Sequence, residues 1–324
     1  MEKILYEVKK IVVGQDHFLE RVMVAMLAQG HLLVEGVPGL AKTLTVKTLA
    51  RTIHGSFRRI QFTPDLVPAD LVGTRIYSQK TGEFSTSLGP VFCNLLLADE
   101  INRAPAKVQS ALLEVMQERQ VTIAGETHKV PEPFLVMATQ NPIETEGTYP
   151  LPEAQVDRFM MKVLVGYPTP EEEFVIVERV TGVENAVAAV SSTTELAALQ
   201  RDCRKVYVDP SLIKYAVTLA AATRDPAAHG LAELAKFLSF GVSPRGPIHL
   251  IEGSRALAYL RGRSYVLPQD VIDLVPDVFR HRLVLTYEAL AEAINADEVL
   301  HRALRKIPAP EKLLETHVSL AAQS

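Results

Sequence analysis

Cysteine is scarce in this sequence, with only two occurrences in 324 residues. Cys93 and Cys203 belong to no CxxC pair and to no cysteine–histidine cluster. This pattern argues against a disulfide framework and against a zinc module. The nine histidines show neither an HExxH motif nor another paired-ligand spacing. We therefore expect no metal site built from histidines.

Long hydrophobic runs are also missing. No segment approaches the ~18 apolar residues of a membrane-spanning helix. The N-terminus, MEKILYEVKKIVV, alternates charged and apolar residues and lacks the apolar stretch of a signal peptide. We expect a cytoplasmic protein without membrane insertion. A net charge of -4 argues against a global attraction to nucleic acid, so proteins or small ligands are the expected partners.

The composition is that of a globular protein, with 48% hydrophobic and 22% charged residues, and the length fits a large domain plus a smaller one. Short apolar runs alternate with helical patterns through the first half, at 31–35, 57–62, 94–99, 134–140 and 161–166. Strands that alternate with helices predict a parallel sheet covered on both faces. We assign this α/β domain to residues 1–185.

Two segments interrupt that pattern. Alternation around Ala124-Gly125-Glu126 predicts a β-hairpin over about 120–130. Residues 63–93 contain several prolines and glycines without a clear period, and they are interpreted as a long, loop-rich insertion.

Strand signals end after Pro168 and Pro170, and residues 181–194 have the small, polar composition of a linker. We predict a second, all-α domain over 195–324. Its helices are expected at about 194–206, 210–223, 245–262 and 268–284.

A glycine-containing loop joins the first expected strand to an amphipathic helix, which is the context of a P-loop. Backbone N–H groups of such a turn and the positive end of the helix bind phosphate. Lys42 would bridge the β- and γ-phosphates of ATP, and Thr43 would coordinate Mg²⁺. A strand-turn-helix with a chance Lys-Thr pair is the alternative. The candidate nucleotide-binding residues are Gly36, Val37, Pro38, Gly39, Leu40, Ala41, Lys42, Thr43 and Leu44.

Ala41 stands where the general P-loop pattern has its second glycine. Alanine still supplies a backbone N–H there. We expect the phosphate cradle to survive this replacement if Ala41 has a negative φ.

An acidic pair, Asp99-Glu100, ends the strand expected at 94–99, at the edge where parallel sheets bind ligands. Asp99 would contact Mg²⁺, and Glu100 would orient and polarise the attacking water. Alternatively, the pair caps the helix that begins near Pro105. Asn141 closes the next strand and would contact the γ-phosphate or the water, although Asn before proline also marks a turn.

Two arginines are further candidates. Arg158 follows the loop EGTYPLPEAQV and could act on a neighbouring subunit, where such an arginine stabilises transition-state charge. An intrachain ion pair is the alternative. Arg245 opens a helix of the second domain, where it is either a nucleotide contact or a solvated first-turn arginine. Arg103 has no assigned role.

Five segments together resemble, in order and spacing, the MoxR family of AAA+ ATPases: GVPGLAKT, LLLADEINRAPAKVQSALLEVMQE, ATQNP, LPEAQVDRF and GVSPRG. The resemblance extends from Val13 to Arg245 and beyond. It implies that Lys42 and Thr43 form Walker A, and that Asp99 and Glu100 form Walker B. It further implies sensor 1 at Asn141, the arginine finger at Arg158, sensor 2 at Arg245 and an adenine pocket at Val13, Gly14 and Gln15. An alanine at position 41 looks usual for the family.

The resemblance also implies a P-loop AAA+ core with a helical lid and a hexamer that uses ATP and Mg²⁺. Residues 63–93 and 120–131 are similar to the helix-2 insert and the pre-sensor 1 hairpin, which would line the pore. The family remodels a partner, commonly a von Willebrand factor A-domain protein, in chaperone-like maturation or metal insertion. A nucleic-acid translocase and a nucleotide-dependent scaffold with little turnover are the alternatives.

Overall fold

The computed structural model describes residues 1–37, 39–80, 82–141, 147–182 and 186–311. The chain divides into two compact units, Met1–Gln200 and Arg201–Ser324. The second domain predicted from the sequence begins at residue 195, inside helix α8 (Thr193–Cys203). The Gln200 side chain donates a hydrogen bond to the Met26 carbonyl at 2.7 Å, and Leu196 is fully buried. Most of α8 therefore belongs to the first unit.

A five-stranded parallel sheet forms the centre of the first unit, in the order β2-β5-β8-β1-β9. Its strands coincide with the five apolar runs, so the predicted parallel sheet is confirmed. All three inner strands are buried except at their last residue, as expected when both faces are covered. The strands are β1 (Leu32–Glu35), β2 (Phe57–Gln61), β5 (Leu95–Asp99), β8 (Leu135–Gln140) and β9 (Met161–Leu164).

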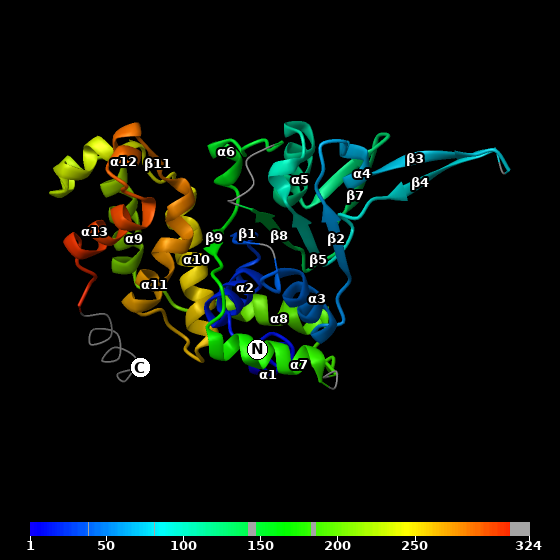
Figure 1. The fold of residues 1–324 in the computed structure, drawn as a ribbon, viewed down its shortest axis with the longest axis horizontal. Coiled ribbons are helices and arrows are strands. Elements are labelled where there is room, and N and C mark those ends of the chain that lie inside the picture. Colours follow the sequence, from blue (N-terminus) through cyan, green and yellow to red (C-terminus); the bar gives the residue numbers. More distant parts are fainter. Residues whose placement is uncertain (38, 81, 142–146, 183–185, 312–324) are drawn as a thin grey trace, which may run out of the picture. The chain divides into compact units, whose positions relative to one another are not determined.

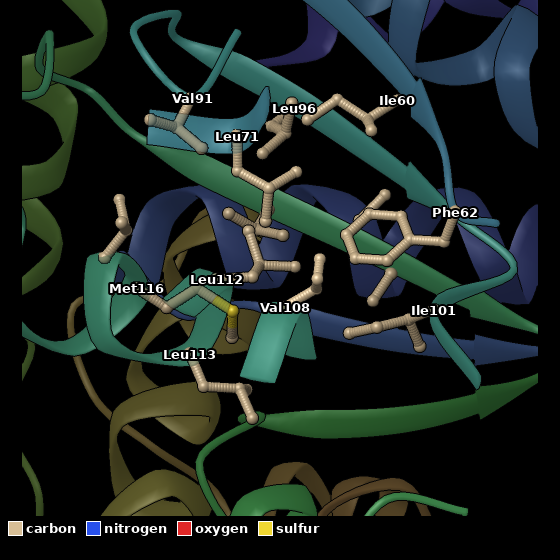
Figure 2. Packing of buried hydrophobic residues seen from close by; sticks show 14 of the residues in the cluster. Ile60, Phe62, Leu71, Val91, Leu96, Ile101, Val108, Leu112, Leu113 and Met116 are labelled. Carbon is tan, nitrogen blue, oxygen red and sulfur yellow. The ribbon is translucent and has the colours of Figure 1, made fainter. Parts of the chain in front are cut away.

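Helices pack on both faces of this sheet (Figure 1). Leu96 and Ala98 of β5 point to the same face because side chains alternate along a strand. There they join the apolar stripe of α5 (Ala106–Glu118), including Val108 and Leu112, in one buried cluster (Figure 2). The remaining helices of the unit are α1 (Glu2–Lys9), α2 (Asp16–Ala28), α3 (Lys42–Thr52), α4 (Pro68–Val72), α6 (Glu153–Val156) and α7 (Pro170–Thr181), with one 3-10 turn, η1 (Ile101–Arg103).

The insertion at 63–93 is more regular than expected. It contains α4 and a hairpin of β3 (Gly73–Ser78) and β4 (Glu83–Leu88), which extends away from the sheet (Figure 1). Both faces of the hairpin are open to solvent, and Ile76 and Phe84 are at least half exposed. Neither strand therefore needs the alternation of apolar and polar residues by which a strand is detected in a sequence. The second hairpin, β6 (Gln120–Ile123) with β7 (Glu126–Lys129), is confirmed where it was predicted.

The second unit is helical, as predicted. Its buried Asp270 caps α11 and accepts hydrogen bonds from Arg263 at 2.6 and 2.7 Å and from Arg261 at 3.0 Å. Sequence reasoning missed its short antiparallel pair, β10 (Leu238–Phe240) and β11 (Val284–Leu285). The helices are α9 (Pro210–Arg224), α10 (Arg245–Leu260), α11 (Pro268–Phe279), α12 (Tyr287–Ala291) and α13 (Ala296–Lys306), with 3-10 turns η2 (Ala227–His229), η3 (Ala232–Phe237) and η4 (Arg280–Arg282).

Across the described ranges, none of the helices has the length and apolar content that crossing a bilayer requires.

Candidate active site

A cavity of about 390 Å³ opens where β1, β5 and β8 end and α3 begins. Its volume lies within the roughly 300–1,000 Å³ of small-molecule pockets. The cavity brings the predicted loop, acidic pair and sensor asparagine together. Its lining residues are Gly36, Gly39, Leu40, Ala41, Lys42, Thr43, Leu44, Arg59, Asp99, Glu100, Thr139, Gln140 and Asn141.

The loop between β1 and α3 has special backbone requirements. A Cβ on Gly36 would approach the Val165 carbonyl oxygen to 2.5 Å, so only glycine fits. Gly39 has φ +88°. Ala41 also has a positive φ, of 55°, which corrects the expectation of a negative value. A left-handed alanine costs about 1–2 kcal/mol, and here it leads the chain into the first residue of α3.

Lys42, the first residue of α3, is partly buried and directly follows the loop. Its Nζ donates a hydrogen bond to the Gly36 carbonyl at 2.6 Å. Burial lowers the pKa of the Lys42 ammonium, while the negative charges of Asp99 and Glu100 oppose that shift. The first N–H groups of α3 have no acceptor within the helix, so ammonium and backbone donors meet in one cavity.

Asp99 is held from two sides. Its Oδ1 accepts a hydrogen bond from the Thr139 hydroxyl at 2.6 Å. Its Oδ2 accepts hydrogen bonds from Arg59 Nε at 3.1 Å and Nη2 at 2.7 Å. Arg59 lies on β2, the edge strand beside β5. The carboxylate that was expected to contact a metal therefore has a cationic partner within the protein.

Glu100 adopts a left-handed conformation with φ 57° directly after β5. Its backbone N–H donates to the Thr139 hydroxyl oxygen at 2.9 Å. Its Oε2 accepts a hydrogen bond from Gln61 at 2.7 Å and pairs with Arg103 at 3.0 Å. Thr139 thus orients both acidic residues, and Arg103, to which the sequence assigned no role, is an ion-pair partner of Glu100.

Sequence reasoning missed Arg59, Gln61 and Thr139. All three lie near the carboxyl ends of predicted strands. Gln61 is the last residue of β2, Arg59 lies two residues before it, and Thr139 is the second-last residue of β8. A position near the end of a strand is only a weak signal for a site residue, because the order of strands in the sheet decides which side chains become neighbours. The pairing of Gln61 with Asp99 across β2 and β5 is a long-range contact.

Other candidates lie outside the cavity lining. Val13 and Val37 are not among the lining residues, and Pro38 lies outside the described residues. Gly14 has φ +65°, and a Cβ there would meet the Glu172 carboxylate at 2.6–2.8 Å. The neighbouring Gln15 donates its side-chain amide to the Gly166 carbonyl at 3.0 Å. This segment therefore packs against the region around α7.

The two candidate arginines are in different units. Arg158 follows α6 in the first unit, and its Nε atom is buried without a hydrogen-bond partner among the described residues. Arg245 is the first residue of α10 in the second unit, where its side chain is exposed. Its backbone N–H donates to the Ser243 hydroxyl at 3.2 Å.

The donor atoms of the cavity fit a magnesium–nucleotide complex better than a metal ion alone. No cluster of three or more His, Cys, Asp or Glu side chains suited to a metal occurs in the described part of the chain. Mg²⁺ in such sites is held by one or two protein oxygens together with substrate phosphates and waters. Asp99 and Thr43, which both line the cavity, supply oxygens of this kind.

The parallel sheet, the glycine-containing loop before α3, the acidic pair at the end of β5 and the separate helical unit together define an AAA+ ATPase. Residues 31–161 match the model of the ATPase family associated with various cellular activities (AAA), and residues 232–303 match the AAA lid domain. The chain belongs to the MoxR family of AAA+ ATPases.

Relatives support this assignment along nearly the whole chain. Chaperone MoxR1 of Mycobacterium tuberculosis is 55% identical, over 96% of this chain and 82% of its own length. Protein MoxR of Paracoccus denitrificans is 31% identical, over 93% of each chain. A crystal structure from Cytophaga hutchinsonii superposes with a TM-score of 0.91 at 48% identity and covers 96% of this chain and 94% of that chain.

Proposed function

We propose that the cavity between the loop and the acidic pair binds Mg²⁺-ATP for hydrolysis. Lys42 would hold the β- and γ-phosphates, and Thr43 and Asp99 would hold the metal, which neutralises phosphate charge when bound. Glu100 would orient the attacking water, and Asn141 would contact the γ-phosphate or that water. The observation that carries this proposal is the convergence of these five side chains on one cavity.

We further propose that each active site lies between two copies of the chain. Arg158 would complete the site of a neighbouring copy. In phosphoryl transfer, an arginine supplied by a neighbouring copy stabilises the charge of the transition state. Contacts of this head-to-tail type form a ring when the rotation closes, and the family resemblance supports a homo-hexamer as that ring. Arg245 would act as the nucleotide sensor of the lid.

The energy of hydrolysis would drive remodelling of a protein partner. A relative is named Chaperone MoxR1, which supports chaperone-like maturation of a client. The family resemblance supports a von Willebrand factor A-domain protein as that client, with metal insertion as one form of the reaction. We further propose a cytoplasmic location.

Nucleotide binding is tested by titrating the protein with a fluorescent ATP analogue and Mg²⁺. We expect saturable binding by the parent chain and a Kd at least about tenfold higher for Lys42→Ala, because the charge-assisted phosphate contact is lost. Lys47→Ala removes the same charge from the same helix outside the cavity lining and serves as control. Equal affinity of the Lys42→Ala variant and the parent would refute the assignment.

A second prediction concerns the Arg59–Asp99 ion pair. Arg59 occupies the Oδ2 atom of Asp99, so a contact between Mg²⁺ and that oxygen would compete with the arginine. Arg59→Ala should therefore lower the Mg²⁺ concentration at half-maximal nucleotide binding by about 1.4-fold to fivefold, the range set by an exposed pair worth roughly 0.2–1 kcal/mol. Arg58→Ala, one residue away and on the opposite side of β2, is the matched control. An unchanged or higher Mg²⁺ midpoint in Arg59→Ala would count against metal contact by Asp99.

A further inference from the structure

Gln109 is a fully buried glutamine on α5 whose side-chain amide joins two separate segments. Its Nε2 lies within hydrogen-bond distance of three backbone carbonyl oxygens. They are those of Ile101 at 3.2 Å, Ala104 at 3.1 Å and Tyr149 at 2.9 Å. Three carbonyl acceptors around one nitrogen determine the orientation of the amide, because a reversed amide would place its oxygen against them.

The other end of this side chain makes the arrangement unusual. The Gln109 Oε1 atom is buried and has no hydrogen-bond partner among the described residues. Its neighbours along the helix, Val108, Leu112 and Leu113, are apolar and buried. A methionine would fill similar space without an orphaned oxygen. The contacts of Nε2, rather than packing, therefore distinguish glutamine from an apolar residue here.

The two segments that Gln109 joins carry different parts of the proposed active site. Ile101 and Ala104 belong to the η1 turn and its end, directly after Glu100. Tyr149 begins the segment that leads through α6 to Arg158. A second bond, from the Tyr149 N–H to the Asn102 carbonyl at 2.6 Å, joins the same two segments.

Both segments have contacts independent of Gln109, because the Tyr149–Asn102 bond remains and Leu151 and Phe159 are buried. The η1 turn is nevertheless the more buried of the two, since α6 contains no buried residue. Ile101 is fully buried, and the N–H of Glu100 is bound by Thr139. The segment before Arg158 makes a second hydrogen bond to α5, from Gln155 Nε2 to the Ser110 hydroxyl at 3.1 Å. This bond is exposed to solvent and therefore weaker than the buried bonds of Gln109. Loss of the Gln109 amide should therefore displace the Arg158 segment more than Glu100.

We propose that Gln109 is a positioning residue that keeps the Arg158 segment in register with the Glu100 turn. This inference rests on the proposed function, in which Arg158 serves the neighbouring copy. Through Gln109, α5 carries both the water-orienting group of one site and the arginine of the next.

Gln109→Met removes the donor and keeps the size of the side chain. We expect kcat to fall about tenfold to a hundredfold, because a misplacement near 1 Å is sufficient for such a loss, while the Kd for the ATP analogue stays within about twofold. Gln117→Met makes the same change at an exposed position of α5 and should behave as the parent. Turnover of Gln109→Met equal to that of Gln117→Met, or a matching loss of nucleotide affinity, would overturn the inference.

Mixing experiments separate a positioning role from general damage. Gln109→Met should regain turnover when it is mixed with Glu100→Gln, because the Glu100→Gln copy supplies a correctly placed Arg158. It should gain none when mixed with Arg158→Ala, because neither copy then supplies that arginine. Recovery with Arg158→Ala alone would overturn the inference. A reference mixture of Arg158→Ala and Glu100→Gln that restores nothing would instead refute the shared site of the proposed function. If Gln109→Met does not fold, Gln155→Ala serves as the second variant, because it removes the exposed hydrogen bond from Gln155 to Ser110. It should give a smaller fall in kcat with the same mixing pattern. Turnover of Gln155→Ala equal to that of the parent would overturn the inference.

Discussion

Arg158→Ala should lower the kcat for ATP hydrolysis by about 10³-fold or more, while the Kd for the nucleotide changes by no more than about twofold. The arginine would act on charge that develops in the transition state of a neighbouring site, so its loss affects chemistry more than ground-state binding. Steady-state ATPase assays and nucleotide titrations of the same preparations measure the two quantities.

Arg158→Lys is the informative companion variant. Lysine keeps the charge and loses the planar fork of donors, so we expect only partial recovery of kcat. The subunit that contributes the arginine is identified by mixing Arg158→Ala with Glu100→Gln, since only a shared site restores turnover at mixed interfaces. Full activity of the isolated Arg158→Ala variant would show that the arginine has no part in the reaction.

Glu100→Gln should block hydrolysis and preserve binding of Mg²⁺-ATP. The amide keeps an oxygen that can accept the hydrogen bond of Gln61, but it removes the carboxylate that would polarise the water. General-base effects of this kind are worth about 10²–10⁴ in rate. Single-turnover hydrolysis and nucleotide affinity are the measurements. Glu114→Gln, an exposed change of the same type on α5, is the control. Hydrolysis at the parent rate by Glu100→Gln would remove Glu100 from its role.

The same hydrolysis-deficient variant provides the test of the partner. Loaded with ATP, it should retain a protein client that the parent releases, and a von Willebrand factor A-domain protein is the predicted identity. The nucleic-acid alternative makes a different prediction. DNA would stimulate the ATPase activity of the parent, and this stimulation would decline steeply with salt.

The glycines, strands and acidic pair were predictable because each depends on local pattern. The inner strands of the sheet need near-continuous apolar runs, which became β1, β5 and β8, whereas the edge strands β2 and β9 mix buried and exposed residues. The β3–β4 hairpin was not predictable in this way. Its two solvent-facing sides need no periodic burial, so its backbone pairing left little trace in the sequence.

The sequence by itself determined the parallel α/β core, the helical second unit and the chemical groups available at the carboxyl ends of the strands. Only the tertiary structure decided which of these groups meet. It placed Arg59 of β2 against Asp99 of β5 and brought Gln109 of α5 to the Tyr149 carbonyl. The physical reason is that periodicity is a local property of the chain, whereas strand order and buried hydrogen bonds depend on contacts between residues tens of positions apart.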